Sequence, residues 1–164
     1  MTLDDFAKSA RDLLRHTLAT VAYRGAKVLS DAPDSFASFR AAESTRTPVQ
    51  ILAHLGDLFD WALSMAKGQE TWHNSKPLPW HDEIQRFFTS LRSFDAYLAS
   101  DEPLHASPEK LFQAPVADAL NHIGQLAMLR RMAGAPIKGE NYFMAEISAG
   151  RVGQDQPKPK REFD

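Results

Sequence analysis

Apolar residues recur at intervals of three and four along four long stretches of the chain, and this periodicity limits the folds open to it. Three of the stretches cover residues 3–29, 48–68 and 108–134. In the fourth, the apolar stripe comprises Ile84, Phe87, Phe88, Leu91, Phe94, Tyr97 and Leu98. This spacing places apolar side chains on one face of an α-helix, and no segment shows the alternation of a half-buried strand. The pattern therefore predicts an all-α protein built as an antiparallel four-helix bundle.

Residues at the ends of these stretches support the predicted helix boundaries. Thr47 is followed by Gln50 three positions later, which is a capping-box pair for the start of the second helix. Gly68 and Gly134 are typical residues just beyond a helix C-terminus. Pro115 interrupts the last pattern, so we expect that helix to be re-set there.

The bundle is expected to occupy residues 1–136 as one domain, since a chain of 164 residues can bury a sizeable core. Residues 137–164 are then a C-terminal extension that packs on the bundle or stays partly extended. Within it, residues 141–150 are a short helical candidate with Asn141 as a cap, whereas residues 154–164 are polar and broken by prolines.

Composition excludes several classes of function. The chain has no cysteine, which removes disulfides, thiolate metal sites and a cysteine nucleophile. Its net charge of −2 lacks the basic surplus of nucleic-acid-binding proteins, so we expect no nucleic-acid partner. The start of the chain is acidic and amphipathic, and no run of apolar residues is long enough for a membrane span. We therefore expect a cytoplasmic protein without a membrane partner.

Two of the six histidines differ from the rest. Four fall in connections or off the apolar stripes and are expected at the surface: His16, His73, His81 and His105. His54, by contrast, lies in the same stripe as Ile51 and Leu58, and His122 shares a helix face with Leu126. These spacings predict two histidines on the inner faces of two helices.

A divalent metal is one interpretation of this arrangement, because imidazole is a preferred ligand for zinc, nickel, copper and ferrous iron. Asp118 lies one helical turn before His122 and would be the third ligand, which leaves positions open for water or substrate. Gln125 would orient His122 from the second shell of the site. The alternative is a local Asp118–His122 pair, with the carboxylate favoured by its place near a helix start.

Two further features of the same regions leave alternatives open. Gly124 within a helix carries a cost relative to alanine, so either close helix packing or room for a ligand is expected there. Three tryptophans lie on the second helix and in the connection after it: Trp61, Trp72 and Trp80. They are candidates for the wall of an apolar pocket or for ordinary core positions.

The chain resembles the DinB/YfiT-like superfamily, the damage-inducible four-helix bundle proteins of bacteria, over nearly its whole length. The segments that carry the resemblance are TPVQILAHLGDLFDWAL at residues 47–63 and HIGQLAMLRRMAG at residues 122–134. The family has one ligand histidine in the second helix and an HxxxH pair on the last, before a Gly-Gln-Leu step. His54 matches the first of these and His122 the end of the pair, while Asp118 stands where the family has its other histidine.

The resemblance implies a metal-dependent enzyme, because the superfamily contains transferases and isomerases that act with low-molecular-weight thiols, and metal-dependent hydrolases. It implies a divalent ion, zinc or nickel, held by His54, Asp118 and His122, with a small-molecule substrate such as a thiol and a homodimeric state. Two alternatives remain at this point. One is a non-catalytic small-molecule-binding bundle with a vestigial or absent metal site, and the other is a structural dimerisation module.

Overall fold

The computed structural model describes residues 3–163 of the chain, with side chains from Lys8 onward, and it is mostly helical. Its long helices are α1 (Leu3–Leu29), α2 (Pro48–Ala66), α3 (Trp80–Ala99) and α5 (Ala117–Met132). The shorter elements are η1 (Asp34–Ser38), α4 (Pro108–Leu111), η2 (Phe112–Val116), β1 (Gly139–Glu140), η3 (Tyr142–Met144) and β2 (Glu162–Phe163). The all-α expectation is thus met, apart from one two-stranded sheet.

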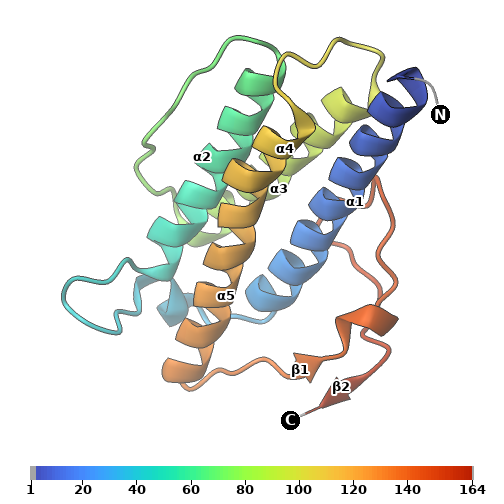
Figure 1. The fold of residues 1–164 in the computed structure, drawn as a ribbon. Helices are drawn as coiled ribbons and strands as arrows, with labels where there is room; N and C mark the ends of the chain where they lie inside the picture. The colour runs from blue at the N-terminus through green and yellow to red at the C-terminus, as the bar shows by residue number, and fades with distance from the viewer. Residues whose placement is uncertain (1–2, 164) are drawn as a thin grey trace.

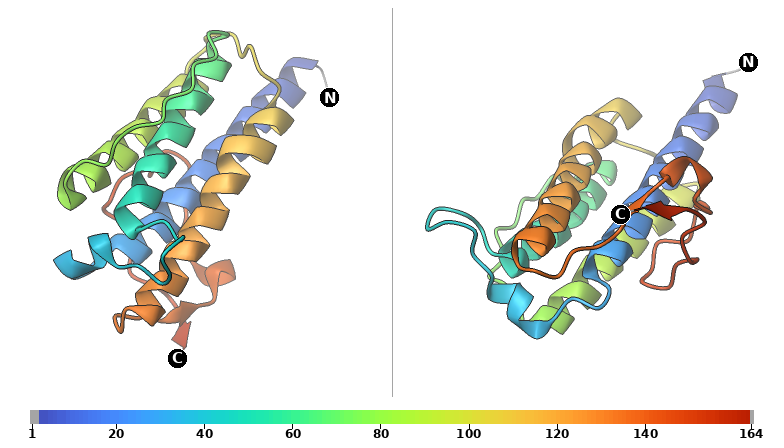
Figure 2. Two further views of the ribbon diagram at one scale, coloured as in Figure 1. Left: turned by 90° about the vertical axis from the view of Figure 1, so that its left-hand side faces the viewer. Right: turned by 90° about the horizontal axis from the view of Figure 1, so that it is seen from below.

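The four long helices lie side by side, and each packs against two of the others: α1 and α2 both contact α3 and α5. Figures 1 and 2 show that α2 and α3 run in the same direction, as do α1 and α5. The expectation of an antiparallel arrangement is therefore wrong for these two neighbouring pairs. The cause is the connection over residues 67–79, which returns along the full length of α2 before α3 begins.

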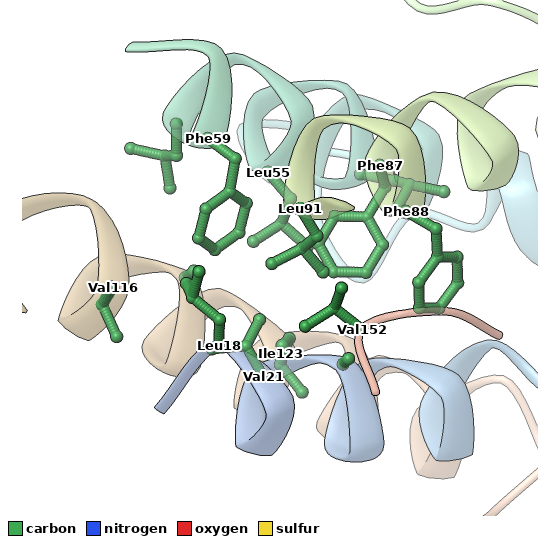
Figure 3. Close-up of a cluster of buried hydrophobic side chains, with 14 of the residues drawn as sticks. Leu18, Val21, Leu55, Phe59, Phe87, Phe88, Leu91, Val116, Ile123 and Val152 are labelled. Atoms are coloured by element: carbon green, nitrogen blue, oxygen red, sulfur yellow. The ribbon is translucent and has the colours of Figure 1, made fainter. Parts of the chain in front are cut away.

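The core lies between the four helices and is built from the apolar stripes seen in the sequence. Figure 3 shows side chains from every long helix meeting there, among them Leu18, Leu55, Phe87 and Ile123. These side chains are at most 4% exposed. Val152, from the segment after α5, is equally buried and belongs to the same cluster.

The helical run from Pro108 to Met132 passes through Pro115 without a break. Pro115 and its neighbours form a π-helical turn, η2, between α4 and α5, and the residues on either side keep helical backbone angles. A proline lacks the amide hydrogen and clashes with the carbonyl four residues earlier, and the wider turn relieves both constraints. The expected re-set at Pro115 is therefore a local widening within one continuous helix.

The segment after α5 runs beside α1 (Figure 2), and polar side-chain contacts tie the two together. Tyr23 donates a hydrogen bond to Glu140 at 2.5 Å, and Lys27 bridges Glu140 and Glu162 at 2.7 and 2.8 Å. Burial and the bond to Glu140 both raise the pKa of Tyr23. These contacts hold residues 140 and 162 against α1.

Local structure within this segment differs from the sequence prediction. Residues 141–150 contain only the single 3₁₀ turn η3, where the Asn141 side chain caps the Phe143 amide at 3.1 Å. Strands β1 and β2 pair antiparallel, with Gly139 opposite Phe163. Two-residue strands are too short to show a period in the sequence, which is why no strand was expected. Among the described helices, none has an apolar stretch sufficient to cross a membrane.

Candidate metal centre

His54, Asp118 and His122 come together where α2 packs against α5. One ligand atom from each lies within 4.8 Å of the other two, and no other such group of three occurs among the side chains described from Lys8 onward. His54 comes from the second turn of α2, and Asp118 and His122 lie one turn apart on α5. The pairing that the sequence predicted from i,i+4 spacing on one helix and an inward histidine on another is present in the structure.

Asp118 lies between the two imidazoles. Its Oδ2 is 3.4 Å from Nε2 of His54 and 3.5 Å from Nε2 of His122. The two rings stand nearly perpendicular, at 87°, with centroids 4.8 Å apart. Two atoms bound to one tetrahedral zinc ion at about 2.0–2.2 Å lie roughly 3.3–3.6 Å from each other. Both separations from Asp118 fall in that range, so its carboxylate already has the spacing of a shared ligand site.

Gln125 holds the ring of His122 from the opposite edge. The Nδ1 of His122 lies 2.7 Å from Oε1 of Gln125. A carbonyl oxygen only accepts hydrogen bonds, so Nδ1 must carry the hydrogen and the lone pair of the neutral ring sits on Nε2. That lone pair faces Asp118, which is the tautomer that a metal-ligating histidine needs. Gln125 itself is exposed.

His54 is disposed to be neutral. Burial lowers its pKa, the nearby His122 lowers it further, and Arg46 acts in the same direction, whereas Asp118 raises it. The net shift is downward. A neutral imidazole has a lone pair available, and only that form binds a metal ion. The structure therefore places two imidazole nitrogens and one carboxylate oxygen around one point.

The site is at the surface of the helix pair and not in the core. The side chains of His54 and His122 are 19% and 12% exposed, and that of Asp118 is 43% exposed. The sequence predicted these polar residues in the bundle interior, where burying polar groups costs free energy. The observed exposure of the three side chains corrects that prediction. A half-exposed carboxylate is compatible with access from solvent.

The helix-start explanation of Asp118 does not hold. α5 begins at Ala117 only because the π turn precedes it, and the helical run itself starts at Pro108. Asp118 therefore has a helical turn before it, whose carbonyls pair with the amides that a free N-terminus would leave open. Its carboxylate is therefore not placed to interact with the dipole of a free helix N-terminus. The contacts it makes are with the two histidines.

Trp72 covers one side of His54. The indole of Trp72 meets the His54 ring edge-on at 5.6 Å and meets Trp61 in the same way at 5.6 Å. Trp61 in turn donates to Glu70 at 3.1 Å. Trp72 thus contacts both His54 and Trp61. Trp80 does not, because it is buried in the core against Phe36.

Other sequence candidates lie away from the site or are not needed there. His16, His73, His81 and His105 are exposed, which confirms the expectation for them. A Cβ atom on Gly124 would meet nothing within 4 Å, so neither close packing nor a neighbouring side chain explains that glycine in this structure.

A buried ionic cluster beside His54 was not predicted. Arg86 of α3 donates to Asp57 and to Glu83 at 3.1 Å, and both carboxylates are nearly inaccessible, at 2% and 0% exposure. The Arg86 guanidinium lies directly against Gly56, where a Cβ atom would come within 3.0 Å of it. Burial lowers the pKa of Arg86, but the hydrogen bonds to Asp57 and Glu83 outweigh this and raise it. The signals available in the sequence were Gly56 and an aspartate inside an otherwise apolar helix.

The same cluster fixes the connection between α2 and α3. Asp57 accepts from the backbone amide of Ser75 at 2.9 Å and from its hydroxyl at 2.7 Å, and Glu83 accepts from the Leu78 amide at 2.7 Å. Asp57 lies one helical turn after His54 on α2. The segment that passes over the histidine is therefore anchored by buried charge.

Comparison with known proteins places this geometry in no group. No family model matches the chain, no curated protein is similar to it, and no solved structure matches its fold.

Proposed function

We propose that this protein is a metal-dependent enzyme of the thiol-transferase or hydrolase type, with a DinB/YfiT-like four-helix bundle as its scaffold. The observation that carries the proposal is the meeting of His54, Asp118 and His122 from two helices at a solvent-accessible point. The ion proposed is divalent, zinc or nickel, and the substrate is a small molecule such as a low-molecular-weight thiol.

The donor set fits such an ion. Two imidazole nitrogens and one carboxylate oxygen are ligands that zinc accepts in catalytic sites, where three protein ligands leave a position open. The same donors suit nickel, which binds N and O ligands more tightly than manganese or iron does. Asp118 in place of a third histidine adds one negative charge, which favours a divalent cation at this point.

The chain's own residues have distinct tasks in this proposal. Gln125 fixes the tautomer of His122, and Trp72 shields one side of His54 from water. The exposed edge of Asp118 leaves the approach for substrate. When bound, the ion supplies Lewis-acid chemistry that makes a thiol or a water molecule acidic enough to react at neutral pH.

A non-catalytic small-molecule-binding protein is the second candidate, and one observation favours it. Asp118 Oδ2 lies within hydrogen-bonding distance of Nε2 of His54, at 3.4 Å, and a neutral His54 with its hydrogen on Nε2 donates to the carboxylate there, which pairs the two residues without any ion. The homodimeric state and the cytoplasmic location belong to the proposal as well, and light scattering at micromolar concentration tests the former.

Metal content per chain is the decisive measurement. The wild type should bind about one zinc or nickel ion per chain after exposure and removal of excess. His54→Ala and His122→Ala should each lose most of the ion while their far-UV circular dichroism stays helical. His16→Ala is the matched control, because His16 is an exposed histidine on α1 that lies outside the cluster.

Melting gives an independent readout. An ion that binds only the native state raises its stability by mass action, so added zinc or nickel should raise the Tm of the wild type and of His16→Ala. The two cluster variants should not respond. If the wild type binds neither zinc, nickel nor manganese and melts identically in all three, the enzyme proposal is wrong and the binding protein is the better description.

A further inference from the structure

A small cavity lies directly beside His54, and its wall contains no residue of α5. Its volume is about 200 Å³, enough for several water molecules or for a small polar group. It is lined by Arg46, Gln50, His54, Asp57, Asn74, Ser75 and Pro77. One wall is thus the beginning of α2, and the other is the anchored part of the connection to α3.

The one acidic residue in the cavity wall has its hydrogen-bonding capacity in use. Oδ1 of Asp57 accepts from the Ser75 hydroxyl and from Arg86, and Oδ2 accepts from the Ser75 amide. Its charge is paired with the guanidinium of Arg86. Asp57 therefore shapes the cavity and contributes little as an acceptor or as a free negative charge within it.

The remaining polar groups are mainly donors. Oε1 of Gln50 accepts from the Thr47 amide at 2.9 Å, so the NH₂ of that side chain is the end left for a ligand. Arg46 is exposed, and none of the carboxylates whose side chains are described, from Lys8 onward, lies in ion-pair distance of it. Both residues are at the N-terminus of α2, where the helix dipole adds positive potential.

We propose that this cavity binds an anionic group, a carboxylate or a phosphate, of the molecule whose reacting part lies at His54, Asp118 and His122. Arg46 supplies the charge, and the amides of Gln50 and Asn74 supply neutral donors. The assignment rests on the proposed function for its statement about the reacting part, whereas the anion site itself is a property of the cavity. The substrate class is then a small organic acid or phosphate ester.

Succinate, succinamide and inorganic phosphate serve as probes, titrated into metal-free full-length protein and followed by backbone amide chemical shifts. Saturable shifts are expected for succinate or phosphate at residues 46–50 and 74–77. Arg46→Gln should weaken binding of the anion roughly tenfold, since a hydrogen bond to a charged group is worth about that much. Arg131→Gln, on the exposed end of α5, is the matched control and should bind as the wild type does. Uncharged succinamide should show no dependence on Arg46.

Whichever of succinate and phosphate binds more tightly identifies the anionic group as a carboxylate or a phosphate. Either result supports the cavity as an anion site. Equal affinity in the wild type and Arg46→Gln, or no saturable shift with either anion, overturns it. A parallel succinate titration of zinc-loaded protein separates the two proposals. A chain that takes up no zinc but shows Arg46-dependent succinate binding refutes the enzyme and keeps the anion site. A protein that binds zinc but neither anion refutes the anion site and leaves the proposed metal site standing.

Discussion

Replacing Arg86 with methionine should lower the free energy of unfolding by about 3–5 kcal/mol, the cost of removing one partner from a buried ion pair. The exposed fraction of the paired side chains decides between this cost and the roughly 0–1 kcal/mol that a surface ion pair contributes. Arg86 is 21% exposed, but its partners Asp57 and Glu83 are only 2% and 0% exposed. The variant leaves both carboxylates inside the protein without their cation, so the higher value applies.

The assay is thermal and urea unfolding followed by circular dichroism. For a chain of this size, each kcal/mol shifts Tm by about 2–4 °C, so a fall of roughly 6–20 °C is expected. Adding Asp57→Asn to the methionine variant should recover part of the loss. An asparagine accepts from the Ser75 amide and donates to its hydroxyl, and it brings no charge that needs a partner.

Arg92→Met is the matched control, because Arg92 is exposed on the same helix and donates only to Thr89 at 3.0 Å. It should change stability by no more than about 0.5 kcal/mol. If Arg86→Met costs less than about 1 kcal/mol, or if Asp57→Asn makes the methionine variant still less stable, then the cluster behaves as a surface network and the reasoning from burial fails.

Three further predictions concern the site and the C-terminal segment. Gln125→Ala should reduce zinc affinity about 10–100-fold in a competition assay with a chromogenic chelator, as loss of an outer-shell partner does, while Tm without metal stays close to the wild-type value. Asp118→Ala should weaken zinc binding in the same assay, and Asp118→His should preserve or strengthen it. Tighter zinc binding by Asp118→Ala than by Asp118→His would exclude Asp118 as a ligand. Acidification should loosen the C-terminal segment, because Lys27 lowers the pKa of Glu162 and Lys160 lowers that of Glu146. Carboxylates of this kind stabilise above their unfolded pKa and lose that contribution as pH falls, so the hydrogen-exchange protection factors of residues 139–163 should fall in acid before those of α2 do.

The four helices and the shared face of Asp118 and His122 could be predicted because both follow from spacing along one helix, whereas the approach of His54 depends on how α2 packs against α5. Apolar periodicity fixes which face of α2 or α5 turns inward, and a residue one turn away shares that face. The directions of α2 and α3 could not be obtained in this way. They depend on the path of residues 67–79, and that path is set by Ser75 bonding to Asp57 from 18 residues away.

The ionic cluster escaped prediction for a similar reason. Asp57, Glu83 and Arg86 are residue types found mostly at the surface, and nothing in their local sequence shows that they are buried. Their burial becomes favourable only when α2 and α3 pack, since Asp57 and Arg86 are 29 residues apart. Gly56 was the available sign, because a helix interior glycine leaves space for a neighbour, but its partner is identified only in the structure.

The ties between α1 and the segment after α5 also bear on how the chain emerges from the ribosome. Tyr23 meets Glu140 across 117 residues, and Lys27 meets Glu162 across 135. During translation α1 is made early, yet this side of it has no partner until most of the chain has been synthesised. Nascent chains halted after α5 should therefore expose Tyr23 and Lys27 and lack Val152 in the core. We expect them to be cleaved by protease where released chains resist it.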